Sequence, residues 1–352
     1  MSRMSRQIQT LAIFFVVLAV TLAYRGCPPS TDGPVTKPGD SRDYLLCFWN
    51  LENFFDDKED ARPHKPDKEY DLWFARNPAI LHEKLDHLSK ALVDMNDGKG
   101  PDILAIAEVE SERAADLLRD ALNARLTDPA LHYGPPLMKE VNAGRHIATA
   151  ILSRLPAQRN RTQLLAKQLR ILEGHLEVNG HELVVIASHW TSRLHDEGGA
   201  GRDKYADQIF GRFRAMYMSN PKVDFLVCGD FNDSPDDVSV TRNLHASGDR
   251  GAVKQATEPM LLDLFIGKDS NQFGTLHYHQ WCIFDHIVVS PGLLDDAGWT
   301  CDVDSVRTVN TLVRPGDRKR HPWRFGGEHE KGERGYSDHF PVTVRLKVQG
   351  SN

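Results

Sequence analysis

Apolar runs of strand length recur along the chain and are the clearest structural signal in the sequence. Some alternate apolar and polar positions, as half-buried strands do, and others are rich in branched apolar side chains, as fully buried strands are. The predicted strands are residues 44–49, 103–107, 147–152, 169–178, 183–188, 225–228, 282–290 and 341–348.

Three stretches between these runs place apolar residues three and four positions apart, which is the spacing of one helix face. They are residues 78–97, 111–126 and 203–219. The second begins with Ser111, a residue suited to cap a helix N-terminus. The charged stretch 56–71 is interpreted as an exposed loop. Strands and helices mixed in this way predict one α+β domain over residues 42–350.

The N-terminal segment, residues 1–27, predicts an export signal. Arg3 and Arg6 precede residues 7–24, which carry no charge and are mostly apolar. That run is short for a membrane-spanning helix and fits the core of a signal peptide; an uncleaved membrane anchor is the alternative. Cys27 is a candidate for lipid attachment, but the residues before it fit that pattern poorly.

Residues 28–41 are rich in Pro, Gly, Ser and Thr and predict a linker. Together with the export signal, this linker predicts an extracytoplasmic domain. The protein is therefore expected to be periplasmic, secreted or attached to the membrane through its N-terminal segment.

Composition limits the function classes. The 352 residues are 40% hydrophobic and 26% charged, as in ordinary globular proteins, and the net charge is −6. An acidic net charge argues against a surface that is basic throughout and binds nucleic acid non-specifically. A local basic patch is still compatible with this net charge. Five cysteines without a C-x-x-C pair argue against a cysteine-based zinc site and against a disulfide scaffold.

Six segments carry acids, amides or imidazoles directly at the edge of a predicted strand. A lone acid in such a place is most often a turn or cap residue, but six such segments together point to a functional site. The polar residues at these edges are Asn50 and Glu52, Glu108 and Glu110, His189, Asp230 and Asn232, Asp285 and His286, and Asp338 and His339.

The residue types indicate a metal site beside phosphate-binding groups. Glu108 and Asp338 offer hard carboxylate oxygens and Asn50 offers a neutral amide oxygen. Such ligands suit Mg²⁺ or Mn²⁺, with Ca²⁺ as an alternative. His189 and His339 can donate hydrogen bonds to phosphoryl oxygens or transfer protons.

Two further residues fit the activation of water. Asp230 is the candidate base that orients an attacking water, and Asn232 can hold that water or a phosphate oxygen. No G-x-S-x-G turn occurs in the sequence, so a serine nucleophile is not indicated. The inventory fits metal-assisted water attack on phosphorus, with charge stabilised on the non-bridging oxygens.

The order of the motifs adds a family resemblance. The set WNLEN, AEVE, AILSR, SHW-x-SR, GDFND-x-PDD, FDHI and YSDHFPV resembles the endonuclease/exonuclease/phosphatase superfamily, which includes the pancreatic deoxyribonuclease-like metal-dependent phosphoesterases, and most of all its exported bacterial branch. The resemblance covers about residues 44–347. It implies a four-layer α/β/β/α sandwich of two packed mixed β-sheets flanked by helices.

The resemblance also implies roles for single residues. Glu108 resembles the main metal-binding acid, assisted by Asn50 and Asp338. Asp230 resembles the residue that aligns the nucleophilic water, and Asn232 its neighbour on the phosphate.

Two histidines complete the set. His339 resembles the histidine that contacts the scissile phosphate and is paired with Asp285. His189 resembles a second phosphate-facing histidine of the deoxyribonuclease and phosphatase branches, and the apurinic endonucleases usually carry tyrosine there.

Several signals have two interpretations. Arg193, in a glycine-rich segment after His189, is a candidate substrate contact or part of a plain connector. Residues 314–325 hold five Arg or Lys and one Asp, and form either a solvated loop or a polyanion contact. The roles of Glu52 and His286 stay open between support of the site and ordinary structural contacts.

The leading hypothesis is an exported nuclease that hydrolyses phosphodiester bonds in nucleic acid. The alternative within the same chemistry is a phosphatase or phospholipase C-like enzyme acting on inositol phosphates, sphingomyelin or another small phosphate ester. A non-catalytic polyanion-binding module is a further alternative. Such a module would be expected to lack at least one of the acids or imidazoles at the strand edges, and all of them are present. The sequence indicates no protein partner and no oligomeric state.

Overall fold

The structure is a computed structural model that describes residues 43–141 and 144–350. The predicted export signal and linker lie outside the described residues. Within the described ranges, no helix has the length and apolar character needed to cross a membrane.

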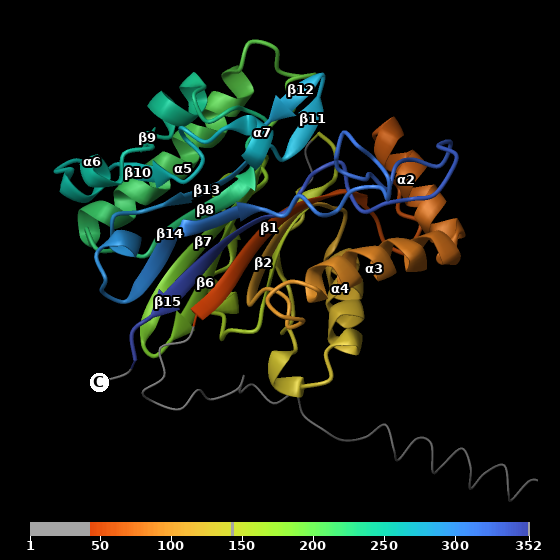
Figure 1. Ribbon diagram of the computed structural model, residues 1–352, viewed down its shortest axis with the longest axis horizontal. Helices are drawn as coiled ribbons and strands as arrows, with labels where there is room; N and C mark the ends of the chain where they lie inside the picture. The colour runs from red at the N-terminus through yellow and green to blue at the C-terminus, as the bar shows by residue number, and fades with distance from the viewer. Residues whose placement is uncertain (1–42, 142–143, 351–352) are drawn as a thin grey trace, which may run out of the picture. The chain divides into compact units, whose positions relative to one another are not determined.

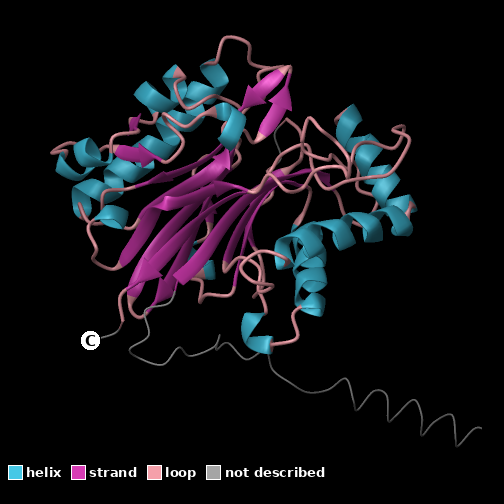
Figure 2. Ribbon diagram, viewed as in Figure 1, coloured by secondary structure: helices cyan, strands magenta, loops and turns pink. Residues whose placement is uncertain are grey.

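Two β-sheets pack face to face at the centre of the domain (Figures 1 and 2). The first sheet has the order β14-β15-β1-β2-β4-β3. Its strands are β14 (Trp299–Thr308), β15 (Val342–Val348), β1 (Asp43–Phe54), β2 (Ile103–Val109), β4 (Ala148–Ser153) and β3 (Leu137–Met138). The β1–β2 pair is parallel and the other pairs are antiparallel, so the sheet is mixed.

The second sheet has the order β5-β6-β7-β8-β13-β10-β9. Its strands are β5 (Gln163–Leu164), β6 (Ile171–Val178), β7 (His181–His189), β8 (Phe225–Asp230), β13 (Asp285–Val289), β10 (Leu261–Asp263) and β9 (Ala246–Ser247). This sheet is mixed as well, because β7 and β8 are parallel whereas β8 and β13 are antiparallel.

Helices cover the outer face of each sheet (Figure 1). On the first sheet they are α2 (Lys65–Arg76), α3 (Pro78–Val93) and α4 (Glu112–Arg125). On the second sheet it is α5 (Ala200–Ser219), whereas α6 (Arg250–Gln255) packs beside the edge strands β9 and β10, and the short α7 (Ser270–Phe273) contacts β14 of the first sheet. A separate hairpin of β11 (Leu276–Tyr278) and β12 (Gln280–Cys282) belongs to neither of these two sheets. This architecture confirms the predicted α+β four-layer sandwich.

Alternation along β1 explains the layers. Leu46 and Phe48 face the core between the sheets, whereas Cys47 and Trp49 face the helices. Successive side chains of a strand point to opposite faces, so a strand buried on both faces needs a continuous apolar run. That is why these central strands stood out in the sequence.

Two predictions about elements were wrong. The stretch 56–71 is not all loop, since α2 begins at Lys65 with Pro66 in its first turn. The charged residues suggested an exposed loop, but Asp67 is buried. Its Oδ2 accepts a hydrogen bond from the backbone N–H of His146 at 2.8 Å. The run 282–290 is also not one strand, because β12 ends at Cys282 and β13 begins at Asp285.

Candidate active site

Three strands of the second sheet deliver polar side chains in register. In the parallel β7–β8 pair, His189 lies opposite Asp230, and in the antiparallel β8–β13 pair, Asp285 lies opposite Asp230. The carboxyl ends of β7 and β8 therefore meet the amino end of β13 at one edge of the sheet. Three of the predicted catalytic residues become neighbours through strand pairing alone.

The first sheet brings the predicted metal ligands to the same place. Asn50, near the end of β1, donates from Nδ2 to Oε1 of Glu108 at 3.3 Å and to Oδ2 of Asp230 at 3.1 Å. It thus bridges the two sheets. The segment that carries Asp338 is fixed by Ser337, whose hydroxyl donates to the carbonyl of Asn50 at 2.6 Å.

Three side chains converge on Oδ2 of Asp230. Besides Asn50, the Nε2 atoms of His189 and His339 lie 3.7 Å and 3.8 Å from this oxygen. Nε2 of His189 also lies 3.9 Å from Oε1 of Glu108. The residues predicted from six separate segments therefore form one cluster.

Backbone strain concentrates at this cluster. Glu52, Asn53, Glu108 and Asn232 have φ between 52° and 61°, which side-chain-bearing residues seldom adopt. Register shifts interrupt β1 and β2 beside Asn50 and Glu108, as β-bulges do when they re-aim a side chain. Non-glycine residues in this conformation persist where surrounding contacts impose them, and they gather at functional sites.

The two histidines differ in their electrostatic environment. Burial disfavours the His339 imidazolium, but Asp285, 2.7 Å from its Nδ1, and Asp230 outweigh burial and hold the pKa of His339 well above its usual range. Burial, with Arg170 and His339 nearby, lowers the pKa of His189 well below its usual range. These surroundings favour the charged form of His339 and the neutral form of His189.

Burial dominates the electrostatics of the acids in the cluster. Burial raises the pKa of Asp230 to about 7, and the neighbouring His339 opposes the shift only in part. Burial and the charge of Glu108 raise the pKa of Asp338, although His339 lowers it. Crowded carboxylates beside an amide are the donor set of a divalent cation.

Two other trios of potential metal-ligating side chains lie among the described residues. In one, Asp230, Asp285 and His339 offer ligand atoms within 4.8 Å of one another. Since His339 and Asp285 already form a hydrogen-bonded pair, the set of Asn50, Glu108 and Asp338 remains our prediction for the metal. The other trio, in the α2 region, includes Glu110. The guanidinium of Arg62 forms an ion pair with Glu110 and thus already supplies a cation there.

Asn232 and Arg193 hold the loop after β8. The backbone N–H of Asn232 donates to Oδ1 of Asp230 at 2.9 Å, and its Nδ2 donates to the carbonyl of Trp190 at 3.2 Å. Arg193 donates from Nε to the carbonyl of Asn232 at 2.9 Å and pairs with Asp233 at 2.9 Å. These contacts give Arg193 a structural task, and its predicted role in substrate binding stays a prediction.

A ring stack lies behind the predicted catalytic residues of the second sheet. Trp190, Phe231 and His286 each directly follow a predicted catalytic residue of their strand, so they point to the opposite face. Trp190 and Phe231 stack at 4.1 Å between ring centroids, and Phe231 and His286 at 4.5 Å. His286 is anchored by Asp263, 2.7 Å from Nδ1, and by the carbonyl of Asp233, 3.0 Å from Nε2.

A second anchor lies behind the first sheet. Sequence reasoning left the role of Glu52 open and missed its contacts with Arg324 and Lys84. The buried carboxylate of Glu52 accepts from Nε of Arg324 at 2.8 Å and from the backbone N–H of Phe325 at 2.7 Å. Lys84 of α3 is fully buried, and its Nζ donates to the carbonyls of Glu52 and Tyr336. This network ties the loop between β14 and β15 to the strand that carries Asn50. Glu52 thus supports the site from behind.

Comparison with known proteins identifies a family with which this chain aligns. The model of the Endonuclease/Exonuclease/phosphatase family matches residues 45–348. No curated protein matches the chain. Among solved structures, an endonuclease/exonuclease/phosphatase family protein from Bacteroides thetaiotaomicron aligns with a TM-score of 0.52 at 16% identity, covering 88% of this chain and 100% of its own.

Two further structures share the fold. Truncated TDP2 of Caenorhabditis elegans aligns with a TM-score of 0.50 at 15% identity, covering 87% of this chain and 97% of its own. Sphingomyelinase C of Streptomyces griseocarneus aligns with a TM-score of 0.50 at 13% identity, covering 86% and 99%. At these identities the likeness extends to the fold alone.

Proposed function

Because the chain belongs to the endonuclease/exonuclease/phosphatase family of metal-dependent phosphoesterases, we propose that it is an exported nuclease that hydrolyses phosphodiester bonds by metal-assisted attack of water. The observation that carries this proposal is the convergence of Asn50, Glu108, His189 and His339 around Asp230. Export is proposed from the basic and then apolar N-terminal segment.

Binding of the phosphate follows from the donors of the site. A divalent cation, Mg²⁺ or Mn²⁺ by preference, held by Glu108, Asn50 and Asp338 would supply neutralisation of the negative charge on the phosphate. The charged His339 donates a hydrogen bond to a non-bridging oxygen, and Asp285 keeps its ring oriented through Nδ1. The neutral His189 donates to the same phosphate without adding charge.

Activation of water falls to Asp230. Its carboxylate accepts hydrogen bonds from Asn50 and from the backbone N–H of Asn232, which fix both oxygens. A water that donates to this carboxylate is oriented toward phosphorus, and the ionised carboxylate can take its proton. A pKa of about 7 places Asp230 near the value at which a base works best at neutral pH.

A substrate panel tests the proposed preference for nucleic acid over a small phosphate ester. Purified protein should be tested on single-stranded DNA, plasmid DNA, RNA, inositol phosphates and sphingomyelin, each with Mg²⁺, Mn²⁺ or Ca²⁺ and with a chelator. We expect oligonucleotide cleavage that the chelator abolishes and added metal restores. Turnover of sphingomyelin or inositol phosphates alone would replace the nuclease assignment, and the absence of all turnover would favour a binding module.

A further inference from the structure

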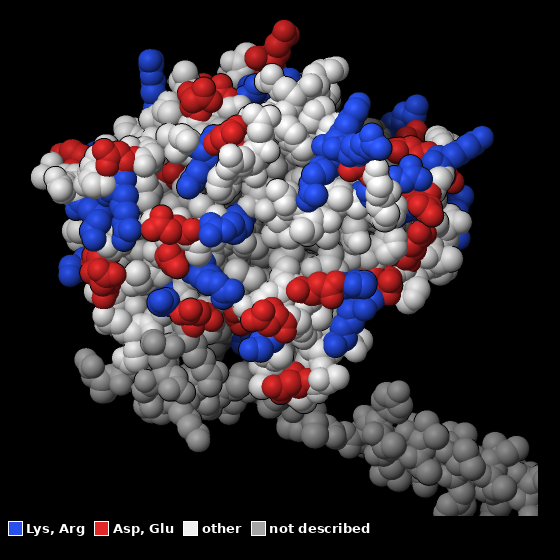
Figure 3. All heavy atoms as spheres, viewed as in Figure 1, with Lys and Arg blue, Asp and Glu red and all other residues white. Residues whose placement is uncertain are grey.

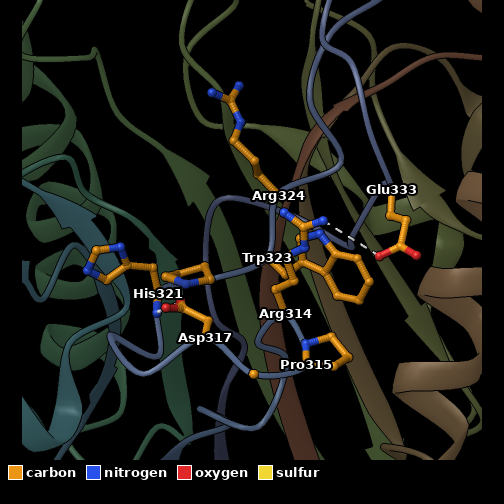
Figure 4. A pocket seen from close by; sticks show the side chains of 9 residues that line it. Arg314, Pro315, Asp317, His321, Trp323, Arg324 and Glu333 are labelled. Carbon is orange, nitrogen blue, oxygen red and sulfur yellow. Dashed lines mark hydrogen bonds and ion pairs between the residues drawn. The ribbon is translucent and has the colours of Figure 1, made fainter.

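The loop between β14 and β15, residues 309–341, contains a pocket that the proposed chemistry does not use. The pocket measures about 630 Å³, and its lining includes Arg314, Asp317, His321, Trp323, Arg324 and Glu333 (Figure 4). The basic segment 314–325 of the sequence supplies most of this lining.

The pocket is connected directly to the catalytic segment. The carbonyl of Trp323 accepts the backbone N–H of Tyr336 at 2.5 Å, two residues before Asp338. Gly335 lies so close to Trp323 that an added Cβ would overlap the carbonyl oxygen and ring of Trp323. Trp323 therefore packs against the chain that positions a predicted metal ligand.

The two arginines that line the pocket, Arg314 and Arg324, differ in how free they are to bind an anion. Arg324 extends away from the other lining side chains in Figure 4 and is held by Glu52. Arg314 pairs with Glu333 only at 3.7 Å, and both side chains are more than half exposed, at 59% and 75%. Such an exposed pair contributes little stability, so Arg314 can exchange this partner for an anion at small cost.

The surroundings of the pocket are positively charged. Arg318, Lys319 and Arg320 are exposed beside it, and the carboxylate of Asp317 is engaged by the backbone N–H groups of Lys319 and His321. In Figure 3, Lys and Arg side chains gather over the part of this face where Figure 1 draws the loop. A chain of net charge −6 thus carries a local patch of positive potential here.

Aromatic rings accompany these cations. Trp323 lines the pocket, and His321 stacks on His277 of the β11–β12 hairpin at 3.7 Å. The hairpin reaches the catalytic segment, because Leu276 forms a β-bridge with His339. Aromatic faces beside arginines bind unstacked bases and their phosphates together.

We infer that this pocket is a distal subsite for single-stranded nucleic acid, in which Trp323 stacks on a base and Arg314 contacts a phosphate one or more nucleotides from the scissile bond. The inference deepens the proposed function and rests on it. A duplex would keep its bases stacked and out of reach of Trp323. A lipid surface is disfavoured because no residue lining the pocket is among the exposed large apolar residues of the described chain.

The test uses the variants Arg314→Ala and Trp323→Leu, with Arg318→Ala as the matched control. Arg318 belongs to the same segment but does not line the pocket. We expect Arg314→Ala and Trp323→Leu each to lower kcat/KM for a single-stranded decanucleotide about tenfold, mainly through KM, which corresponds to the loss of one stacking or phosphate contact. Turnover of bis(p-nitrophenyl) phosphate, which is too small to reach the pocket, should not change in Arg314→Ala. Trp323 also packs against the segment of Asp338, so for Trp323→Leu the expected result is a larger loss on the decanucleotide than on this small ester.

Fluorescence anisotropy with a labelled oligonucleotide and EDTA measures binding without turnover. If wild-type protein binds the strand in a manner that depends on Arg314 but does not cut it, the nuclease proposal fails and the subsite stands. If the enzyme cuts the strand and both pocket variants match Arg318→Ala, the subsite fails and the nuclease stands. Equal losses on both substrates in Arg314→Ala, or binding of anionic vesicles in place of the oligonucleotide, would also overturn the subsite.

Discussion

Replacement of His286 by phenylalanine tests whether the ring stack positions the catalytic strands. Phenylalanine keeps a ring against Phe231 but removes both hydrogen bonds of the imidazole. Asp263 is then left as a buried carboxylate whose remaining hydrogen bond comes from the backbone N–H of Phe265 at 2.8 Å. The carbonyl of Asp233 loses its contact with Nε2 at the same time.

The size of the effect follows from burial. His286 and Asp263 are both almost completely buried, and Asp263 raises the pKa of His286 although burial acts to lower it. Removal of one partner from such a buried pair costs about 3–5 kcal/mol, because the other charge stays buried without compensation. The loss is a substantial part of the 5–15 kcal/mol that typically stabilises a domain.

The assay is a double-mutant cycle followed by urea denaturation. Asp263→Asn removes the charge while its amide oxygen can still accept from Phe265. We therefore expect the double variant His286→Phe/Asp263→Asn to be more stable than His286→Phe alone, by about 2 kcal/mol. This recovery is the signature of an orphaned charge.

A catalytic readout separates positioning from stability. Under conditions where the protein stays folded, His286→Phe should lower kcat about tenfold, since small displacements of a reacting group cost this much or more, and metal affinity should change little. If His286→Phe equals the wild type in both stability and kcat, or if the double variant is no more stable than the single one, the reasoning is wrong.

Three further outcomes are expected. Glu108→Ala should lower metal-dependent turnover by about three orders of magnitude and weaken metal binding in calorimetry, and retained activity would remove Glu108 from the metal site. His339→Ala should lower kcat by about 10²–10⁴ while metal affinity stays within a few-fold, and a collapse of metal affinity would contradict its assignment to the phosphate. Burial raises the pKa of Asp224 to about 7, against the opposing hydrogen bond from Trp299. Because the pKa of Asp224 is raised in the folded state, the folded protein binds more protons than the unfolded chain. The free energy of unfolding therefore decreases as the pH rises from about 4 to about 7. In urea unfolding, Asp224→Asn should show a smaller decrease over this range than the wild type.

Strand patterns predicted a mixed α+β domain and the polar residues that gather at the strand edges, whereas the four-layer sandwich was implied by the family resemblance. Every predicted catalytic and metal residue follows or begins an apolar run, and the ends of such runs meet at sheet edges. The edge strand β14 escaped prediction because Asp302, Asp304 and Arg307 interrupt its apolar positions. One face of that strand is partly exposed, so its pattern is weaker than that of a central strand.

The supporting residues were harder to predict because their partners are distant in the sequence. Lys84 lies three and four positions from Leu81 and Leu88, on the buried stripe of α3, and this position was the only signal it gave. Nothing local connects Glu52 with Arg324, since their contact joins residues 272 positions apart. Such pairings arise from tertiary packing, which periodicity does not encode.

The pairing of β1 with β15 has a consequence for the newly made chain. The indole of Trp49 donates to the carbonyl of His339 across 290 positions, and β1 lies between β15 and β2 in the sheet. A nascent polypeptide released only as far as β13 lacks His339 and Asp338 and cannot close the first sheet around β1. With the roles predicted for Asp338 and His339, hydrolysis of phosphate esters requires the last stage of synthesis and folding, in which β15 docks against β1.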